Sequence, residues 1–268
     1  MSEKALIGRY LPGTSPLHRM DPRAKMLLAL VYLVAAFAAQ TFWGLAVVAA
    51  FTVAFFRIAR ITLRQALGSI APLIFILVIT ALLNVFFVQS GEVLVQAGPL
   101  VITVGGLAQA AFITVRVLLL LVGMSLLTLT TTTLDITDAF ERLLAPFARF
   151  GLPAHELGML MGIALRFLPQ FVEELGIIYR AQISRGAQIS ANVFKGGMRT
   201  ITSLMVPLFT SAFRHAETLS LAMDARCYHG GGGRTRLAPL AYGPLDARAT
   251  AVLACLVILV VATNFIPQ

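Results

Sequence analysis

Four stretches of the chain are apolar over enough residues to cross a membrane as helices, since about 20 apolar residues span the ~30 Å hydrocarbon core of a bilayer. They are Met26–Ala39 with its flanks, Ile70–Val88, Leu107–Leu129 and Ala249–Ile266. A shorter stretch, Trp43–Phe56, is bounded by aromatic residues and by Arg57, a pattern typical of a membrane edge, so we count it as a fifth. The sequence therefore predicts an all-α integral membrane protein with about five transmembrane helices, embedded in a lipid bilayer.

The positive charge of the chain is explained by membrane topology. Charged residues make up 12% of the sequence, the formal net charge is +9 and the mean hydropathy is +0.86. If the amino terminus lies inside, every lysine and arginine except Arg116 falls on the cytoplasmic side. The predicted outer loops, around Gln40–Phe42 and Gln89–Thr103, contain no base. The positive-inside rule thus predicts a cytoplasmic amino terminus and an external carboxyl terminus, and gives no reason to expect nucleic acid as a partner.

Two features of the predicted membrane region call for specific structures. Arg116 falls near the middle of a predicted span, where a bare charge costs at least ~2.5 kcal/mol, so we expect it to face protein and to find a polar partner. The segment Gln89–Val104 contains two glycines and a single acid, Glu92, and two more glycines follow it directly, Gly105 and Gly106. We expect an outer turn there, either re-entrant or folded as a short hairpin.

Two long amphipathic stretches, Leu157–Arg185 and Ile201–Arg226, each end in an arginine. In both, apolar residues recur at alternating spacings of four and three, which places them on one face of a helix. Charged residues interrupt both stretches, and burying them in lipid would cost about 2.5 to 3.5 kcal/mol each, so we expect these helices at the inner membrane surface. Each stretch also contains a proline, Pro169 or Pro207, which bends a helix. We therefore expect the two helices to curve and to cross.

The two stretches end alike, in Ala181-Gln-Ile-Ser-Arg185-Gly186 and in Ala222-Met-Asp-Ala-Arg226-Cys227. We interpret them as related helices that present one arginine each at the same relative position. A rigid guanidinium at a helix end suits docking into an acidic groove. The duplication favours a two-fold or pseudo-two-fold partner over a single small-molecule site.

A short amphipathic helix is expected before the two long ones. Asp135-Ile-Thr-Asp138 is typical of a helix start with acids in the first turn. Its apolar residues are Phe140, Leu143, Leu144 and Phe147, and it is expected to end around Pro146 and Gly151-Leu-Pro153. We divide the chain into a membrane domain, residues 1–134, with a cytoplasmic leader and four transmembrane helices, a cytoplasmic coupling domain, residues 135–244, and a last transmembrane helix, residues 245–268.

No residue pattern in the sequence indicates catalysis. His155-Glu156 begins like a zinc-protease motif, but Met159 occupies the position of the second histidine. The glycine run 230–233 lacks the spacing of a phosphate-binding loop and is better explained as a flexible connection. We expect no enzyme activity, no cofactor and no metal, and an energy source in another subunit if energy is used. His215, on the apolar stripe of the second long stretch, is expected to be a packed or interfacial histidine and not a ligand.

Several motifs together resemble one family. These motifs are the leader Ile7-Gly-Arg-Tyr-Leu-Pro-Gly-Thr-Ser15 with His18–Lys25, the segment Thr131–Pro146, Gly151-Leu-Pro153 and Ala164–Pro169. Together they resemble the transmembrane T component of energy-coupling-factor (ECF) transporters, the EcfT/CbiQ family. The match runs nearly from end to end. The leader is most similar to the shared, multi-substrate branch of that family.

The resemblance implies the roles of the two arginine motifs. In the family, two coupling helices cross like an X, and their Ala-Arg-Gly motifs dock into grooves of two ABC-type ATPases. The matching triplets here are Ser184-Arg185-Gly186 and Ala225-Arg226-Cys227. Serine in place of the first alanine is expected to be harmless. Cys227 replaces a glycine that would supply a left-handed turn, which leaves the geometry of the second triplet open although its charge is kept.

The resemblance also implies a mechanism and a location. ATP binding and hydrolysis would move the ATPases, the arginine-tipped helices would transmit that motion, and a small membrane-embedded S component would tilt to release its vitamin inside. The chain would then be a non-catalytic, multi-pass subunit in the plasma membrane of a prokaryote.

Two alternatives remain: a T component dedicated to cobalt, nickel or biotin, and a secondary transporter with its own substrate path. The second would need acids or broken helices at mid-membrane, and the predicted spans offer only Pro72 and Asn84.

Overall fold

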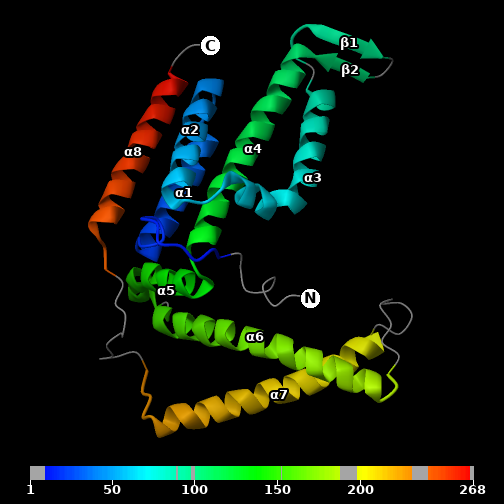
Figure 1. The fold of residues 1–268 in the computed structure, drawn as a ribbon, viewed down its shortest axis with the longest axis vertical. Coiled ribbons are helices and arrows are strands. Elements are labelled where there is room, and N and C mark those ends of the chain that lie inside the picture. The colour runs from blue at the N-terminus through cyan, green and yellow to red at the C-terminus, as the bar shows by residue number, and fades with distance from the viewer. Residues whose placement is uncertain are drawn as a thin grey trace. The chain divides into compact units, whose positions relative to one another are not determined.

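The computed structural model describes residues 10–88, 90–97, 100–151, 153–187, 198–230 and 241–265. Leader residues 7–9 and glycines 231–233, both considered in the sequence analysis, lie outside these ranges. In chain order the elements are α1 (Pro22–Ala38), α2 (Phe42–Ala59), α3 (Leu63–Phe87), strands β1 (Val93–Ala97) and β2 (Leu100–Thr103), α4 (Val104–Thr130), α5 (Thr133–Leu144), the 3-10 helix η2 (Ala145–Phe150), α6 (Ala154–Ser184), α7 (Met198–Ala225) and α8 (Pro244–Asn264) (Figure 1).

The chain forms two compact units. One comprises Met1–Ala139 with Ala238–Gln268, and the other comprises Phe140–Leu237. Each predicted span corresponds to one helix of the first unit, α1, α2, α3, α4 or α8, and those predicted to end at Ala39 and Val88 extend one residue past their helix. Ile266, the predicted end of the last span, lies outside the described residues. Among the described residues, α2, α4 and α8 are long and apolar enough to cross a membrane, whereas α1 has 17 residues and the apolar part of α3 is the shorter Leu73–Phe87. The all-α membrane fold is confirmed, and the number of five spans stays a prediction.

The core of the first unit lies where α1 packs against α2, α4 and α8. The buried residues at the carboxyl end of α1 are small: Ala35, Ala36 and the C-cap residue Ala39 are at most 4% exposed. Small residues let helix backbones approach closely, which is the common way for helices to associate in a membrane. Large apolar side chains face outward, as with Leu30 and Val34 at 58% exposure each. Lipid is the solvent that such a surface suits.

Tyr32, a buried polar side chain of this core, has hydrogen-bond partners on two other helices, as an apolar medium favours. The Tyr32 hydroxyl of α1 lies 2.8 Å from Oγ1 of Thr52 on α2, and donates to the Leu119 carbonyl of α4 at 2.9 Å. The ring occupies space left by Gly123, because a Cβ there would lie 2.1 Å from it. One tyrosine thus links three helices.

Arg116 of α4 faces protein, as predicted. Its Nη2 donates to the carbonyl of Ala39, which is the C-cap residue of α1, and its guanidinium lies 4.6 Å from the centre of the Phe112 ring. A cation at the carboxyl end of a helix is stabilised by the helix dipole, and a cation above an aromatic face is attracted by the ring. The expected polar partner is therefore a helix-end carbonyl.

The segment between α3 and α4, for which an outer turn is expected, is a β-hairpin, one of the two forms predicted for it. β1 and β2 pair antiparallel, with Val93 opposite Thr103. Gly105 and Gly106 begin α4 directly against the preceding chain, since a Cβ on either would lie 2.4 Å from the backbone carbonyl oxygen of Ser90 or Val88. These two glycines allow the chain to turn sharply between the hairpin and α4.

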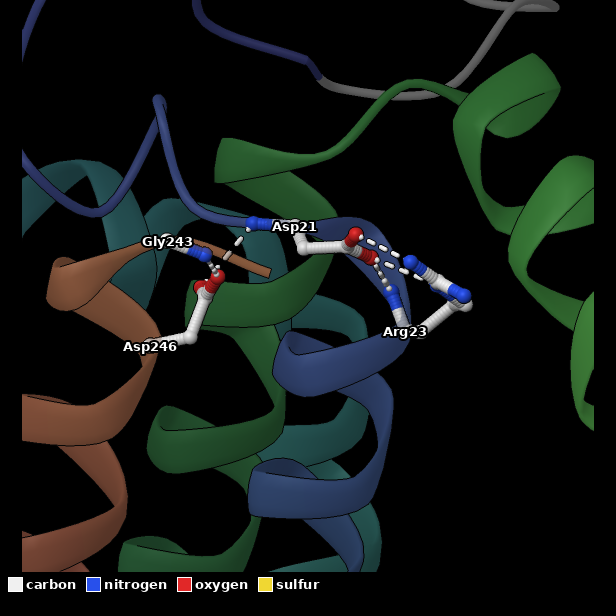
Figure 2. A network of polar contacts seen from close by, with 4 residues as sticks. All are labelled: Asp21, Arg23, Gly243 and Asp246. Carbon is white, nitrogen blue, oxygen red and sulfur yellow. Dashed lines mark hydrogen bonds and ion pairs between the residues drawn. The ribbon is translucent and has the colours of Figure 1, made fainter. Parts of the chain in front are cut away.

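The start of α1 is tied to the start of α8 by the carboxylate of Asp246, while the carboxylate of Asp21 caps α1 itself (Figure 2). Asp21 caps α1, accepting hydrogen bonds from the Arg23 backbone at 2.8 Å and from its guanidinium at 2.8 and 3.1 Å. Asp246 accepts from the backbone N–H of Asp21 at 3.0 Å and from that of Gly243 at 2.7 Å. Burial by itself raises the pKa of Asp21, but the hydrogen bonds and charge of Arg23 outweigh it and hold that pKa below its ordinary value.

The described part of the leader is hydrogen-bonded to the end of α4. The Leu11 backbone N–H donates to the Leu129 carbonyl at 3.0 Å. Lys25, at the start of α1, donates to the carbonyls of His18 and Thr130, both at 3.2 Å. The ammonium therefore satisfies a carbonyl at the end of α4, where a positive charge is favourable.

The short helix α5 begins two residues earlier than predicted, at Thr133. The reason is a cap that precedes Asp135: the Asp135 backbone N–H donates to the Thr132 hydroxyl oxygen at 3.1 Å, and that hydroxyl donates to the Asp135 carboxylate at 2.7 Å. The helix also ends earlier, at Leu144, and continues as the 3-10 helix η2. Pro146 explains this change, because a proline disfavours α-helical geometry in the residue before it.

Candidate functional site

Helices α6 and α7, in the second unit, run antiparallel and cross (Figure 1). Three contacts establish the direction, because residue numbers rise on one helix as they fall on the other. They are Gln170 with His215, Glu174 with Ser211, and Gln182 with Ser203. Each helix contains its predicted proline, Pro169 or Pro207. The expected pair of long crossing helices is confirmed.

A polar cluster joins the two helices where they cross. The Glu174 carboxylate of α6 accepts a hydrogen bond from the Ser211 hydroxyl of α7 and lies 3.6 Å from Nε2 of His215. Nε2 of Gln170 lies 3.3 Å from the same His215 nitrogen. The His215 ring packs on two rings of α6, with centroids 5.9 and 6.0 Å away, Phe167 and Phe171. His215 is the packed histidine that was predicted.

Glu174→Ala is expected to loosen the crossing, because it removes the acceptor of Ser211 and the carboxylate beside His215. A lost hydrogen-bonded charge of this kind corresponds to about 1–3 kcal/mol. Spin labels at positions 184 and 225, in a chain whose Cys227 and Cys255 are serine, should show a broader distance distribution. Glu173→Ala is the control, since Glu173 is the neighbouring carboxylate and is exposed. A distribution unchanged in Glu174→Ala would show that the cluster does not fix the crossing.

The first arginine motif ends α6 in a Schellman turn. Arg185 is the C-cap residue, and Gly186 follows with φ of +80°. The Gly186 N–H donates to the Ile183 carbonyl at 2.9 Å, and the Ala187 N–H donates to the Gln182 carbonyl at 3.0 Å. These two bonds satisfy carbonyls that a helix end leaves without partners, and the left-handed residue between them is typically glycine.

The second motif ends α7 in the same turn. The Cys227 N–H donates to the Asp224 carbonyl at 2.9 Å, and the Tyr228 N–H donates to the Met223 carbonyl at 3.1 Å. Cys227 has φ of +54°, so it adopts the left-handed conformation that Gly186 adopts in the first motif. The question that the sequence left open is answered: Arg226 is presented by the same backbone geometry as Arg185, although a glycine is missing.

The structure exposes all six predicted docking residues and keeps the two triplets apart. Both Arg185 and Arg226 are exposed, and neither guanidinium has an ion-pair partner among the described residues. Because α6 and α7 are antiparallel, the arginines lie at opposite ends of a helix pair about 45 Å long at 1.5 Å per residue. This arrangement offers two separate, similar cationic contacts and no single binding pocket formed by both.

Sequence reasoning missed a groove beside the second motif. It has a volume of about 460 Å³ and is bordered by Arg226, Cys227 and Tyr228. Its apolar wall comes from α6 and α7, through Met159, Ile163, Leu219 and Met223. Leu219 lies on the apolar stripe predicted for the second long stretch, but Met159, Ile163 and Met223 lie outside the predicted stripes, so the pattern could not show this groove. The described residues contain no cluster of side chains suited to a metal ion.

Comparison with known proteins agrees with this geometry. The family model CbiQ, described as cobalt transport protein, matches residues 13–237. The chain belongs to this family. It is 44% identical over 243 residues to the "Energy-coupling factor transporter transmembrane protein EcfT" of Thermosediminibacter oceani, covering 91% of each chain. It is 37% identical over 266 residues to the protein of the same name from Bacillus subtilis, covering 99% of each.

The resemblance inferred from the leader and the helix motifs is thereby confirmed. As a member of the EcfT/CbiQ family, the chain is a T component, a multi-pass membrane subunit of a transporter. Within that subunit, the two arginine motifs at the ends of α6 and α7 are the residues that the sequence singles out most clearly.

Proposed function

We propose that the chain couples ATP hydrolysis by two ABC-type ATPase subunits to uptake of a vitamin or other micronutrient, which a separate membrane-embedded S component binds. The observation that carries this proposal is the repeated helix end: Arg185 and Arg226 are exposed, follow helices of similar length and are presented by the same Schellman turn. A pair of similar ATPases offers two equivalent grooves, and two equivalent arginines match them.

The docking contacts are assigned to Ser184, Arg185 and Gly186 at one end and to Ala225, Arg226 and Cys227 at the other. An arginine suits this task because its planar guanidinium stays charged and can pair with a carboxylate through two hydrogen bonds. The chain itself would hydrolyse nothing, and the motion of the ATPases would reach the membrane through α6 and α7. In this proposal residues 135–244 form the cytoplasmic coupling domain, with the amino terminus inside and the carboxyl terminus outside.

The apolar faces of α6 and α7 supply a second contact surface in this proposal. Phe209 and Phe213 of α7 are 60% and 74% exposed, and Leu160 of α6 is 58% exposed. Amphipathic helices with such faces lie at a membrane surface or against another apolar protein. We assign these faces to the S component and to lipid.

A mild-detergent pull-down of the tagged wild-type chain from its native membrane tests the proposal. Mass spectrometry is expected to identify two related ABC ATPases and a small membrane protein in the eluate. The small protein would name the substrate class, and a dedicated cobalt, nickel or biotin system would be recognised by it. An eluate with no ATPase would overturn the coupling role and favour a secondary transporter.

A further inference from the structure

We infer that Tyr228 is a positioning residue that holds the Arg226 turn in place of the missing glycine. This inference rests on the proposed docking role of Arg226 only for its functional consequence. Its structural part concerns how a cysteine is kept in a left-handed turn, and can be tested by itself.

A left-handed conformation is unfavourable for cysteine. In residues with a Cβ that conformation brings the Cβ too close to the following carbonyl oxygen, whereas glycine adopts positive φ freely. Among the described residues, Cys227 and Arg60 are the non-glycine residues with positive φ. The turn at Cys227 is therefore not set by its own residue type, and neighbouring contacts must hold it.

Tyr228 makes those contacts on both its backbone and its side chain. Its backbone N–H closes the turn on Met223, as described above. Its hydroxyl donates to the sulfur of Met159 on α6 at 3.0 Å and lies 3.5 Å from Nε2 of His155. The residue directly after Cys227 is thus attached to the first turns of a different helix.

The attachment continues beyond α6. Nδ1 of His155 lies 3.2 Å from a carboxylate oxygen of Glu141 on α5, whose side chain is 13% exposed. His155 is therefore oriented from the opposite side by a mostly buried acid. Glu141, His155 and Tyr228 form a polar chain that links α5, the start of α6 and the end of α7. This is the role of the histidine that had resembled the start of a zinc motif.

Among the described residues, no contact of this kind follows Gly186 in the first motif. There Gly186 supplies the left-handed residue, and the position equivalent to Tyr228 is Ala187, whose methyl side chain has no hydrogen-bonding atom. The two ends thus reach one backbone geometry by different means. The turn at Arg185 is intrinsic to its sequence, whereas the turn at Arg226 depends on its packing against the start of α6.

Hydrogen exchange of the turn amides, followed by mass spectrometry on the full-length chain in lipid nanodiscs, tests the structural part. Tyr228→Ala is expected to raise exchange at Cys227 and residue 228 by about 5- to 30-fold, and Tyr228→Phe by less. Adding Cys227→Gly to Tyr228→Ala should restore slow exchange. Gly186→Cys is the matched control at the other end, where no anchor exists, and should raise exchange in the turn formed by residues 185–187. Unchanged exchange in Tyr228→Ala would overturn the inference.

Retention of the ATPases in the pull-down tests the functional part on the same variants. Tyr228→Ala is expected to lower retention of the ATPases severalfold. The double variant Cys227→Gly with Tyr228→Ala is expected to recover retention. Such a recovery would not occur if Tyr228→Ala simply unfolded the chain. If Arg226→Ala lowers retention while Tyr228→Ala leaves it unchanged, the positioning role is overturned. If exchange behaves as expected but even Arg226→Ala keeps every ATPase, the proposed docking function fails and the anchoring by Tyr228 stands.

Discussion

Replacing Arg185 and Arg226 together with alanine is expected to abolish ATP-driven uptake. Each guanidinium is proposed to enter an acidic groove, and truncating one partner of a buried charge pair costs about 2–5 kcal/mol because the other charge is left unpaired. Each single substitution should therefore lower uptake markedly, and the double substitution should leave no coupled transport. The measurement is substrate uptake into vesicles that contain the chain, both ATPases and the S component, beside the rate of ATP hydrolysis.

Two controls separate docking from a general loss of charge. Arg180→Ala with Arg214→Ala removes the same charge from exposed positions on the same helices, outside the two triplets, and should leave uptake near the wild-type level. Arg185→Lys with Arg226→Lys keeps the charge but loses the planar fork, so partial activity is expected. Wild-type uptake by the double alanine variant would refute the mechanical role of the two arginines.

The helices and the arginine ends of this chain follow from local patterns. An apolar run of about 20 residues, and apolar residues spaced alternately three and four apart, are patterns among residues close in sequence. They can therefore be recognised without knowledge of the three-dimensional structure. For that reason the predicted spans fall in α1 to α4 and α8, and the long amphipathic stretches are α6 and α7. The ends of α5 shifted because a cap and a proline, not the apolar pattern, decide where a helix stops.

The contacts that position the site are distant in sequence and could not be predicted this way. Tyr228 and His155 are 73 residues apart, and Asp21 and Asp246 are 225 apart. Cys227 shows the limit most clearly: its residue type argues against a left-handed turn, and only its neighbours in space explain why the turn forms. Local preference is a weak guide where tertiary contacts outweigh it.

Asp246→Ala is expected to cause the largest loss of stability among single substitutions in the membrane unit. Asp246 is 5% exposed, and its carboxylate accepts hydrogen bonds from the backbone N–H groups of Asp21 and Gly243 (Figure 2). Alanine would leave both buried donors unsatisfied, at about 1–3 kcal/mol each. The substitution also unties the start of α1 from the start of α8, which the sequence places at opposite ends of the chain.

Thermal unfolding in mild detergent measures this effect, and the midpoint is expected to fall by about 5–10 °C. Asp246→Asn keeps one acceptor oxygen and should lose about half as much, since one of the two N–H groups retains a partner. Arg248→Ala changes an exposed residue on the same turn of α8 and should leave the midpoint unchanged. If Asp246→Ala unfolded at the wild-type temperature, water or another polar group would have to satisfy both donors, and the carboxylate would not be what holds α1 to α8.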